Sequence, residues 1–174
     1  YEEIEGAIKE NTKLVFIETL GNPNSEVVDI EKIAKIAHKH QIPLVIDNTF
    51  ATPINCRPFE WGADIVTHST TKYMDGHAAC VGGAIVDSGN FDWAAYGDKF
   101  SGLTTPDETY HGIVYTEKFG KAAYITKATS QLMRDLGSIQ SPQNAFLLNL
   151  GLESLHLRMP RHCENAVKMA QYLQ

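Results

Sequence analysis

The sequence contains little cysteine, and what it has is not arranged for metal binding or cross-linking. Its 174 residues include three cysteines, Cys56, Cys80 and Cys163, which are widely spaced and form no CxxC pair. This spacing predicts neither a disulfide framework nor a zinc site, and free thiols favour a cytoplasmic location. Among the seven histidines, His38 and His40 do not share a helix face, and His68 and His77 lack metal-ligand spacing, so no metal is predicted.

Long apolar runs, a basic surplus and the common nucleotide-binding motifs are also missing. No apolar run approaches the ~18 residues that span a bilayer, so the sequence predicts no membrane partner. Fifteen Lys and Arg against 21 Asp and Glu give a net charge of -6, which argues against a nucleic-acid partner. Neither GxxxxGK[ST] nor GxGxxG occurs, which excludes the commonest nucleotide-binding interpretations.

The first part of the sequence predicts a strand–helix–strand unit. Residues 2–11 have the pattern of a helix end, and residues 13–18 and 43–47 are apolar, β-rich runs of strand length. Between these two runs, with Asp29 as N-cap, apolar residues recur at helical spacing: Ile30, Ile33, Ala34 and Ala37. Such a unit closes onto a parallel sheet, so the fold class is predicted to be α/β.

Two further runs, residues 65–69 and 82–87, are typical of short buried strands. Residues 88 to about 140 are irregular and hold half of the 16 aromatic residues, which favours an inserted, packed segment. We therefore predict a domain core over residues 1–140. Ser141-Pro142 then opens a Leu-rich helix, so residues 141–174 are predicted to lead toward a C-terminal domain. Because the chain starts and stops within patterned segments, we expect it to be part of a longer protein.

The strand ends indicate where a ligand would bind. Open α/β sheets bind ligands outside the carboxyl ends of their strands. Residues 18–22, 47–50 and 69–72 follow three of the predicted strands. These three segments are predicted to face one pocket.

A strand-end lysine and a strand-end aspartate are the candidate catalytic groups. A desolvated lysine such as Lys72 could form an imine with an aldehyde, although most lysines are simply solvated. Asp47 ends a buried strand and needs a partner, which a protonated pyridine nitrogen would supply; a helix-capping or metal-binding Asp is the alternative. A strand-end Asp and a strand-end Lys together indicate such a site more specifically than either residue alone. Ser69 and Thr71, three and one residues before Lys72, could bind a phosphate.

Three segments resemble the Cys/Met-metabolism family of pyridoxal 5'-phosphate (PLP) enzymes. They are Glu-Thr-Leu-Gly-Asn-Pro-Asn at 18–24, Asp-Asn-Thr-Phe at 47–50, and His-Ser-Thr-Thr-Lys-Tyr with Gly-His within 68–77. The resemblance spans essentially the whole chain. It implies the large domain of fold-type-I, aspartate-aminotransferase-like enzymes, with a mostly parallel sheet flanked by helices. Ala78 is a small departure from the pattern and affects loop geometry more than chemistry.

The resemblance also implies a role for each candidate residue. Lys72 would carry PLP as an imine, with Asp47 as the partner of the ring nitrogen. Ser69 and Thr71 would bind the cofactor phosphate. Asn22 would lie beside cofactor and substrate. The family further implies a homo-oligomer, a dimer or tetramer.

Within the family, residues 82–93 and the long aromatic segment resemble the O-acetylhomoserine sulfhydrylases. The implied reaction is γ-replacement, in which acetate leaves O-acetyl-L-homoserine and sulfide or a thiol adds, giving homocysteine or methionine. Cystathionine γ-synthase, cystathionine γ-lyase and methionine γ-lyase are alternatives with related chemistry. The non-enzyme alternative is a catalytically incomplete fragment, because relatives complete the site with further segments and a neighbouring subunit.

Overall fold

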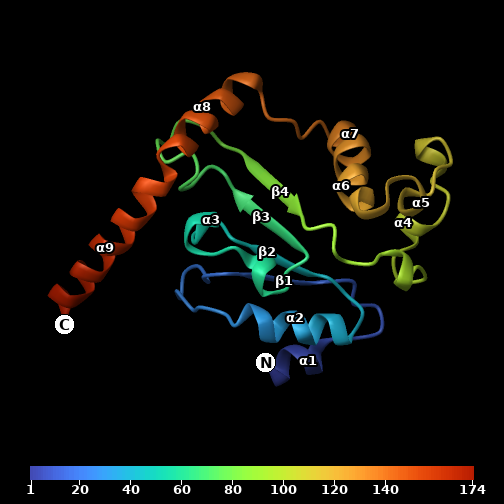
Figure 1. Ribbon diagram of the computed structural model, residues 1–174, viewed down its shortest axis with the longest axis horizontal. Coiled ribbons are helices and arrows are strands. Elements are labelled where there is room, and N and C mark those ends of the chain that lie inside the picture. Colours follow the sequence, from blue (N-terminus) through green and yellow to red (C-terminus); the bar gives the residue numbers. More distant parts are fainter.

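The computed structural model describes residues 1–174 and contains a four-stranded sheet in the order β1-β2-β3-β4 (Figure 1). The strands are β1 (Val15–Glu18), β2 (Leu44–Asp47), β3 (Ile65–Ser69) and β4 (Gly83–Asp87). The first three run parallel, and β4 pairs antiparallel with β3. The predicted α/β class and mostly parallel sheet are confirmed.

One face of the sheet is covered by α2 (Ile30–Lys39), with α1 (Glu2–Ala7) beside it (Figure 1). The Asp29 carboxylate accepts a hydrogen bond from Lys32 N at 3.0 Å, so the predicted N-cap is present. The apolar side of α2 packs with residues of β1 and β2 into one core cluster, whose most buried members are Ile33, Ala37, Ile42, Leu44 and Ile46. Burial of this apolar stripe fixes the helix on the sheet.

The aromatic-rich segment covers the opposite face of the sheet near the amino ends of the strands. Phe91, Trp93 and Tyr115 are buried in a second cluster that includes Val45 and Ile65 of the sheet. Trp93 stacks on Tyr124 with ring centroids 5.4 Å apart. The segment forms short helical pieces: 94–96, α4 (Ser101–Thr104), 108–110, α5 (Tyr115–Phe119), 120–122, α6 (Ala123–Lys127), a π-helical turn at 128–133, and α7 (Arg134–Leu136). Its aromatic side chains therefore pack this segment against the sheet.

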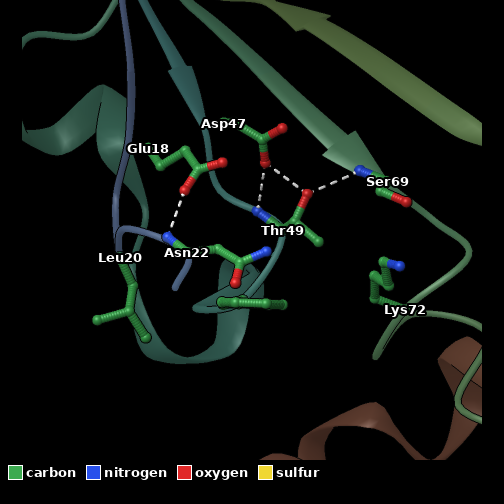
Figure 2. Close-up of a pocket in the computed structure, with 8 residues that line it drawn as sticks. Glu18, Leu20, Asn22, Asp47, Thr49, Ser69 and Lys72 are labelled. Carbon is green, nitrogen blue, oxygen red and sulfur yellow. Dashed lines mark hydrogen bonds between the residues drawn. The ribbon is translucent and has the colours of Figure 1, made fainter. Parts of the chain in front are cut away.

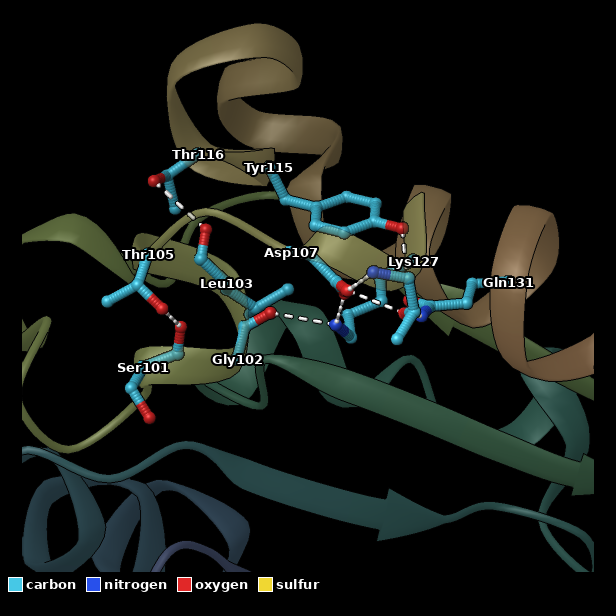
Figure 3. A network of polar contacts seen from close by, with 10 residues as sticks. Ser101, Gly102, Leu103, Thr105, Asp107, Tyr115, Thr116, Lys127 and Gln131 are labelled. Carbon is cyan, nitrogen blue, oxygen red and sulfur yellow. Dashed lines mark hydrogen bonds and ion pairs between the residues drawn. The ribbon is translucent and has the colours of Figure 1, made fainter. Parts of the chain in front are cut away.

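A polar network closes this excursion (Figure 3). Lys127 Nζ donates to the Asp107 carboxylate at 2.6 Å and to Gly102 O at 2.9 Å. The hydrogen bond from Lys127 holds the pKa of Asp107 well below its usual value. Tyr115 Oη donates to Gln131 Oε1 at 3.1 Å. The network therefore joins α6 to α4 and to the loop at Asp107, and joins α5 to the π-helical turn.

Two helices end the chain, α8 (Pro142–Glu153) and α9 (Leu155–Leu173). Ser141 Oγ accepts from Asn144 N at 3.2 Å, and Pro142 occupies the first turn, as predicted. The Leu-rich helical pattern is interrupted at Ser154, which separates α8 from α9, and α9 then extends away from the sheet (Figure 1). Within α9 only Leu155 and Met159 are buried. Short helices α3 (Thr52–Asn55) and 58–61 precede β3.

Two expectations about these elements are wrong in detail. The first helix ends at Ala7 and does not continue to Asn11. β4 is not a buried strand, because it lies at the edge of the sheet and leaves Ile85 49% and Val86 43% exposed. An apolar run identifies a strand without showing whether a neighbour covers it.

Candidate active site

The carboxyl ends of β1, β2 and β3 surround a cavity of about 150 Å³ (Figure 2). The lining residues come from three separate segments of the chain: Glu18, Leu20, Asn22, Asp47, Thr49, Phe50, Ser69 and Lys72. All of them fall within the segments 18–22, 47–50 and 69–72. The prediction that these three segments face one pocket is confirmed.

The parallel register explains this convergence. Glu18 of β1 lies opposite Asp47 of β2, and Asp47 lies opposite Thr67 of β3. Residues paired in a parallel register project from the same face of the sheet. The Asp47 side chain therefore projects near the middle of the sheet, with the strands that end in Glu18 and Ser69 on either side of it.

Thr49 holds the Asp47 carboxylate in place. Its backbone N donates to Asp47 Oδ1 at 2.9 Å, and its hydroxyl donates to the same oxygen. The Thr49 hydroxyl in turn accepts from Ser69 N at 2.8 Å, which links β2 to β3 (Figure 2). Sequence reasoning did not single out Thr49. The turn itself had a signal, since an Asp side chain commonly accepts a hydrogen bond from the backbone N–H two residues further on.

Asp47 has no cationic partner within the chain. Its Oδ2 makes no hydrogen bond, and neither oxygen pairs with Lys, Arg or His, although the residue is half-buried. His68 is close enough to interact with it electrostatically. Burial nevertheless lowers the pKa of His68, and the nearby Asp47 carboxylate opposes this shift. The carboxylate is therefore free to pair with a cationic ligand.

Lys72 lies in the turn that follows β3. Its backbone N donates to Ser69 O at 3.3 Å, and Gly76 N donates to its carbonyl at 2.9 Å. The Nζ atom makes no hydrogen bond or ion pair, and Figure 2 shows Ser69 and Lys72 across the pocket from Glu18 and Asn22. Lys72 is exposed, so this chain does not supply the desolvation expected from the sequence.

The other candidates lie in different settings. Asn22 N donates to Glu18 Oε2 at 2.8 Å, which fixes the loop after β1, and its side chain lines the pocket. Thr71 does not line the pocket. Its hydroxyl donates to Gly82 O at 3.2 Å and accepts from Gly82 N at 3.0 Å. The pocket thus contains four of the five predicted site residues: Asn22, Asp47, Ser69 and Lys72.

Comparison with known proteins places the chain in a family. A family model described as Cys/Met metabolism PLP-dependent enzyme matches residues 1–174. The chain belongs to this family. The resemblance inferred from the sequence motifs is confirmed. The predicted fold type I and the predicted PLP-dependent enzyme class are confirmed with it.

Individual relatives agree with this assignment. The homocysteine/cysteine synthase of Saccharomyces cerevisiae is 51% identical over 174 residues, which cover 99% of this chain and 39% of that protein. A Campylobacter jejuni structure described as an O-acetylhomoserine (thiol)-lyase, which contains N'-pyridoxyl-lysine-5'-monophosphate, superposes with a TM-score of 0.92 at 39% identity, covering 99% of this chain and 42% of that one.

A third comparison is more distant. Cystathionine gamma-lyase from Lactobacillus plantarum, complexed with L-serine, gives a TM-score of 0.70 at 35% identity, covering 98% of this chain and 36% of that one. The chain spans about 40% of the length of the curated relatives it matches, in agreement with the expectation that it is part of a longer protein.

The residues of the pocket fit PLP chemically. The pocket contains the Lys72 amino group and one Asp47 carboxylate oxygen, neither of which has a hydrogen-bond partner, and the Ser69 hydroxyl. These groups match an aldehyde, a protonated ring nitrogen and a phosphate. Beyond the pocket, a mostly apolar groove of about 790 Å³ shares Leu20 and Phe50 with it.

The rest of the chain shows no competing metal site. No group of three or more His, Cys, Asp or Glu side chains is arranged to hold a metal ion. The three cysteines are all free. No helix is both long enough and apolar enough to cross a bilayer.

Proposed function

We propose that the protein containing this chain is a PLP-dependent transferase that replaces the acetoxy group of O-acetyl-L-homoserine with sulfide or a thiol. The products are acetate and homocysteine, or methionine when methanethiol is the nucleophile. The observation that carries the proposal is that the unpaired amino group of Lys72 and the unpaired carboxylate oxygen of Asp47 line the same pocket. It occurs on a chain that is 51% identical to a homocysteine/cysteine synthase.

Lys72 and Asp47 are assigned the central roles. Lys72 Nζ would hold the aldehyde of the cofactor and would remove and return protons at the substrate Cα and Cβ. Asp47 keeps a proton on the ring nitrogen, because a carboxylate at the end of a strand stabilises the cation. When bound, PLP supplies a protonated ring that accepts the electron pairs released by deprotonation. Thr49 holds the Asp47 carboxylate in position for this task.

Ser69, Thr71 and Asn22 are assigned binding roles. The Ser69 hydroxyl would donate to the cofactor phosphate. Thr71 would do the same after exchanging its hydrogen bond to the Gly82 carbonyl, whose distance of 3.2 Å indicates a weak bond. Asn22 would contact the cofactor ring or the substrate from the opposite side of the pocket.

Two observations favour the sulfhydrylase reaction over its alternatives. Several relatives at 42–44% identity are named O-acetyl-L-homoserine sulfhydrylases. The TM-score is also higher for the O-acetylhomoserine (thiol)-lyase than for the cystathionine gamma-lyase, 0.92 against 0.70. Cystathionine γ-lyase is the second candidate, since this neighbour still shares the fold and 35% of the sequence.

We further propose that residues 1–140 form the PLP-binding core and that residues 141–174 lead toward a C-terminal domain of a cytoplasmic homo-oligomer, a tetramer by the family pattern. The exposed apolar residues of α9 support additional packing partners, since Val167, Met169 and Leu173 are all more than half exposed. The three free thiols support a reducing compartment.

The direct test uses the full-length protein loaded with PLP. Borohydride reduction followed by peptide mapping should place the pyridoxyl label at Lys72. Lys72→Ala should lose the label and turnover, whereas Lys118→Ala, an exposed lysine outside the pocket, should keep both. A label on another lysine in the wild-type protein contradicts the assignment.

Substrate assays separate the candidate reactions. Acetate release from O-acetyl-L-homoserine should require sulfide or a thiol and should yield a homocysteine-type product. Preference for cysteine as nucleophile, with cystathionine as product, would indicate a cystathionine γ-synthase. Cleavage of cystathionine would indicate the lyase.

The isolated chain is expected to be a poor catalyst. Lys72 is the only cation that lines its pocket, so the cofactor phosphate and the substrate carboxylate lack cationic partners there. A misplacement of about 1 Å can cost about a hundredfold in rate, and missing partners should cost more. Assaying residues 1–174 with PLP beside the full-length protein tests this, and comparable turnover per site would show that the chain is sufficient.

A further inference from the structure

Backbone hydrogen bonds stabilise the two ends of the turn that carries Lys72, but none involves the carbonyls in its middle. Asp75 N donates to Thr70 O at 3.0 Å, and Gly76 N donates to Lys72 O at 2.9 Å. The carbonyls of Tyr73 and Met74 lie between these bonds, and no backbone N–H donates to either of them. Backbone bonds alone therefore leave the middle of the turn unsecured.

Arg158 of α9 binds both of these carbonyls. Its Nη1 donates to Tyr73 O at 2.8 Å, and its Nη2 lies 3.4 Å from Met74 O. The same guanidinium is held from behind, since Nη2 also donates to Gly151 O at 2.8 Å and Nε donates to Ser154 Oγ at 2.9 Å. The planar fork of an arginine suits this arrangement because its donors point in fixed directions.

The surroundings of Arg158 hold its guanidinium in one position. It makes no ion pair with a carboxylate, so its charge is stabilised by carbonyl oxygens and one hydroxyl. One of these carbonyls belongs to Gly151 in the last turn of α8, where the helix dipole favours a cation. Arg158 also lies between Leu155 and Met159, the two buried residues of α9.

Two glycines allow the helices to touch the turn. A Cβ on Gly151 would lie 2.2 Å from Asp75 O and 2.6 Å from Met74 O, so the backbone of α8 is in direct contact with the turn. A Cβ on Gly76 would lie 2.4 Å from Arg158 Nη1, and Gly76 has a φ of +67°. Larger residues at either position would displace the turn or the guanidinium.

We propose that Arg158 is a positioning residue for Lys72, which it keeps in place by holding the carbonyls of Tyr73 and Met74. The inference rests on the proposed role of Lys72 as the cofactor lysine. Arg158 does not line the pocket and acts only through the backbone of the turn. Its loss allows residues 73 and 74 to move, and Lys72 Nζ then reaches the cofactor in fewer of its conformations.

The experiment uses the full-length, PLP-loaded protein with Arg158→Ala, Arg158→Lys and Gly151→Ala. Arg161→Ala is the matched control, because Arg161 lies one turn further along α9, is 67% exposed and pairs only with Glu164. The readouts are the rate at which borohydride-trapped label accumulates at Lys72 and the midpoint of the pH-dependent change in cofactor absorbance. Values of kcat and KM are measured in parallel.

Arg158→Ala should slow labelling and lower kcat by roughly 10- to 100-fold, as expected for a small misplacement of a reacting group. The absorbance midpoint should shift, while KM changes little. Arg158→Lys should recover part of the loss, since an ammonium can still donate to one carbonyl. Arg161→Ala should match the wild type in every readout.

A purely structural role predicts a different result. If Arg158→Ala lowers only the melting temperature and leaves the labelling rate and absorbance midpoint unchanged, the proposal is overturned. If Arg158→Ala does not fold, Gly151→Ala decides, because its added methyl group pushes on the turn from α8 while alanine favours the helix. Normal labelling in that variant also overturns the proposal. Retention of label and turnover in Lys72→Ala would instead contradict the proposed function, whatever Arg158 does.

Discussion

Replacing Thr49 by valine tests whether a single hydroxyl organises the candidate site. The substitution keeps the shape of the side chain but removes the hydrogen bond that the hydroxyl donates to Asp47 and the one that it accepts from Ser69 N. Asp47 then keeps only the bond from the Thr49 backbone N. The carboxylate becomes free to rotate, and Ser69 N loses its acceptor.

The magnitude follows from these two bonds. A hydrogen bond to a charged group contributes about 1.5–3 kcal/mol, and an unsatisfied buried donor costs about 1–3 kcal/mol. Asp47, Thr49 and Ser69 are only partly buried, so water replaces part of the loss. We expect the free energy of unfolding to fall by about 2 kcal/mol. If the same amount is lost from cofactor binding, the dissociation constant of PLP rises roughly 30-fold.

The assay compares urea unfolding and PLP titration for full-length Thr49→Val and Thr49→Ser. The serine variant keeps the hydroxyl and loses one methyl group, which costs about 0.8 kcal/mol or less. The valine variant should therefore bind PLP clearly more weakly than the serine variant. Equal PLP affinity in the two variants would refute the conclusion that the Thr49 hydroxyl orients Asp47.

Three further outcomes are expected. Asp47→Asn should retain part of its PLP but lose most of its turnover, because a neutral amide cannot hold the ring nitrogen protonated; undiminished kcat removes Asp47 from its role. The hydrogen bond to Asp64 raises the pKa of His38, so this stabilisation is full below about pH 6.5 and is lost as pH rises through the raised value. In urea unfolding, the His38 interaction makes the free energy of unfolding larger at pH 5.5 than at pH 8, and His38→Gln should remove this contribution. We expect the contribution to be under about 1 kcal/mol, since the imidazole is 43% exposed. Asp107 behaves oppositely: its lowered pKa gives stability that is present above about pH 4 and lost as pH falls, so Lys127→Met should destabilise the protein more at pH 7 than at pH 3 in thermal melts.

The sequence by itself determined the strands, the first βαβ unit and the three segments of the pocket. Apolar runs of four to six residues identify strands, and Asp29 and Ser141 mark helix starts because a side-chain oxygen must accept a free backbone N–H there. Parallel strands place their carboxyl ends at one edge, so the positions of Asp47 and Lys72 beside one pocket follow from local patterns alone.

Only the tertiary structure decided how these residues are held. The Thr49 hydroxyl joins residues 20 positions apart, Arg158 binds the carbonyl of Tyr73 across 85 positions, and Thr71 turns its hydroxyl to Gly82. The exposure of β4 likewise depends on whether another segment covers it. Local propensity reports on a residue and its neighbours in sequence, whereas these contacts depend on where distant backbone groups come to lie after packing.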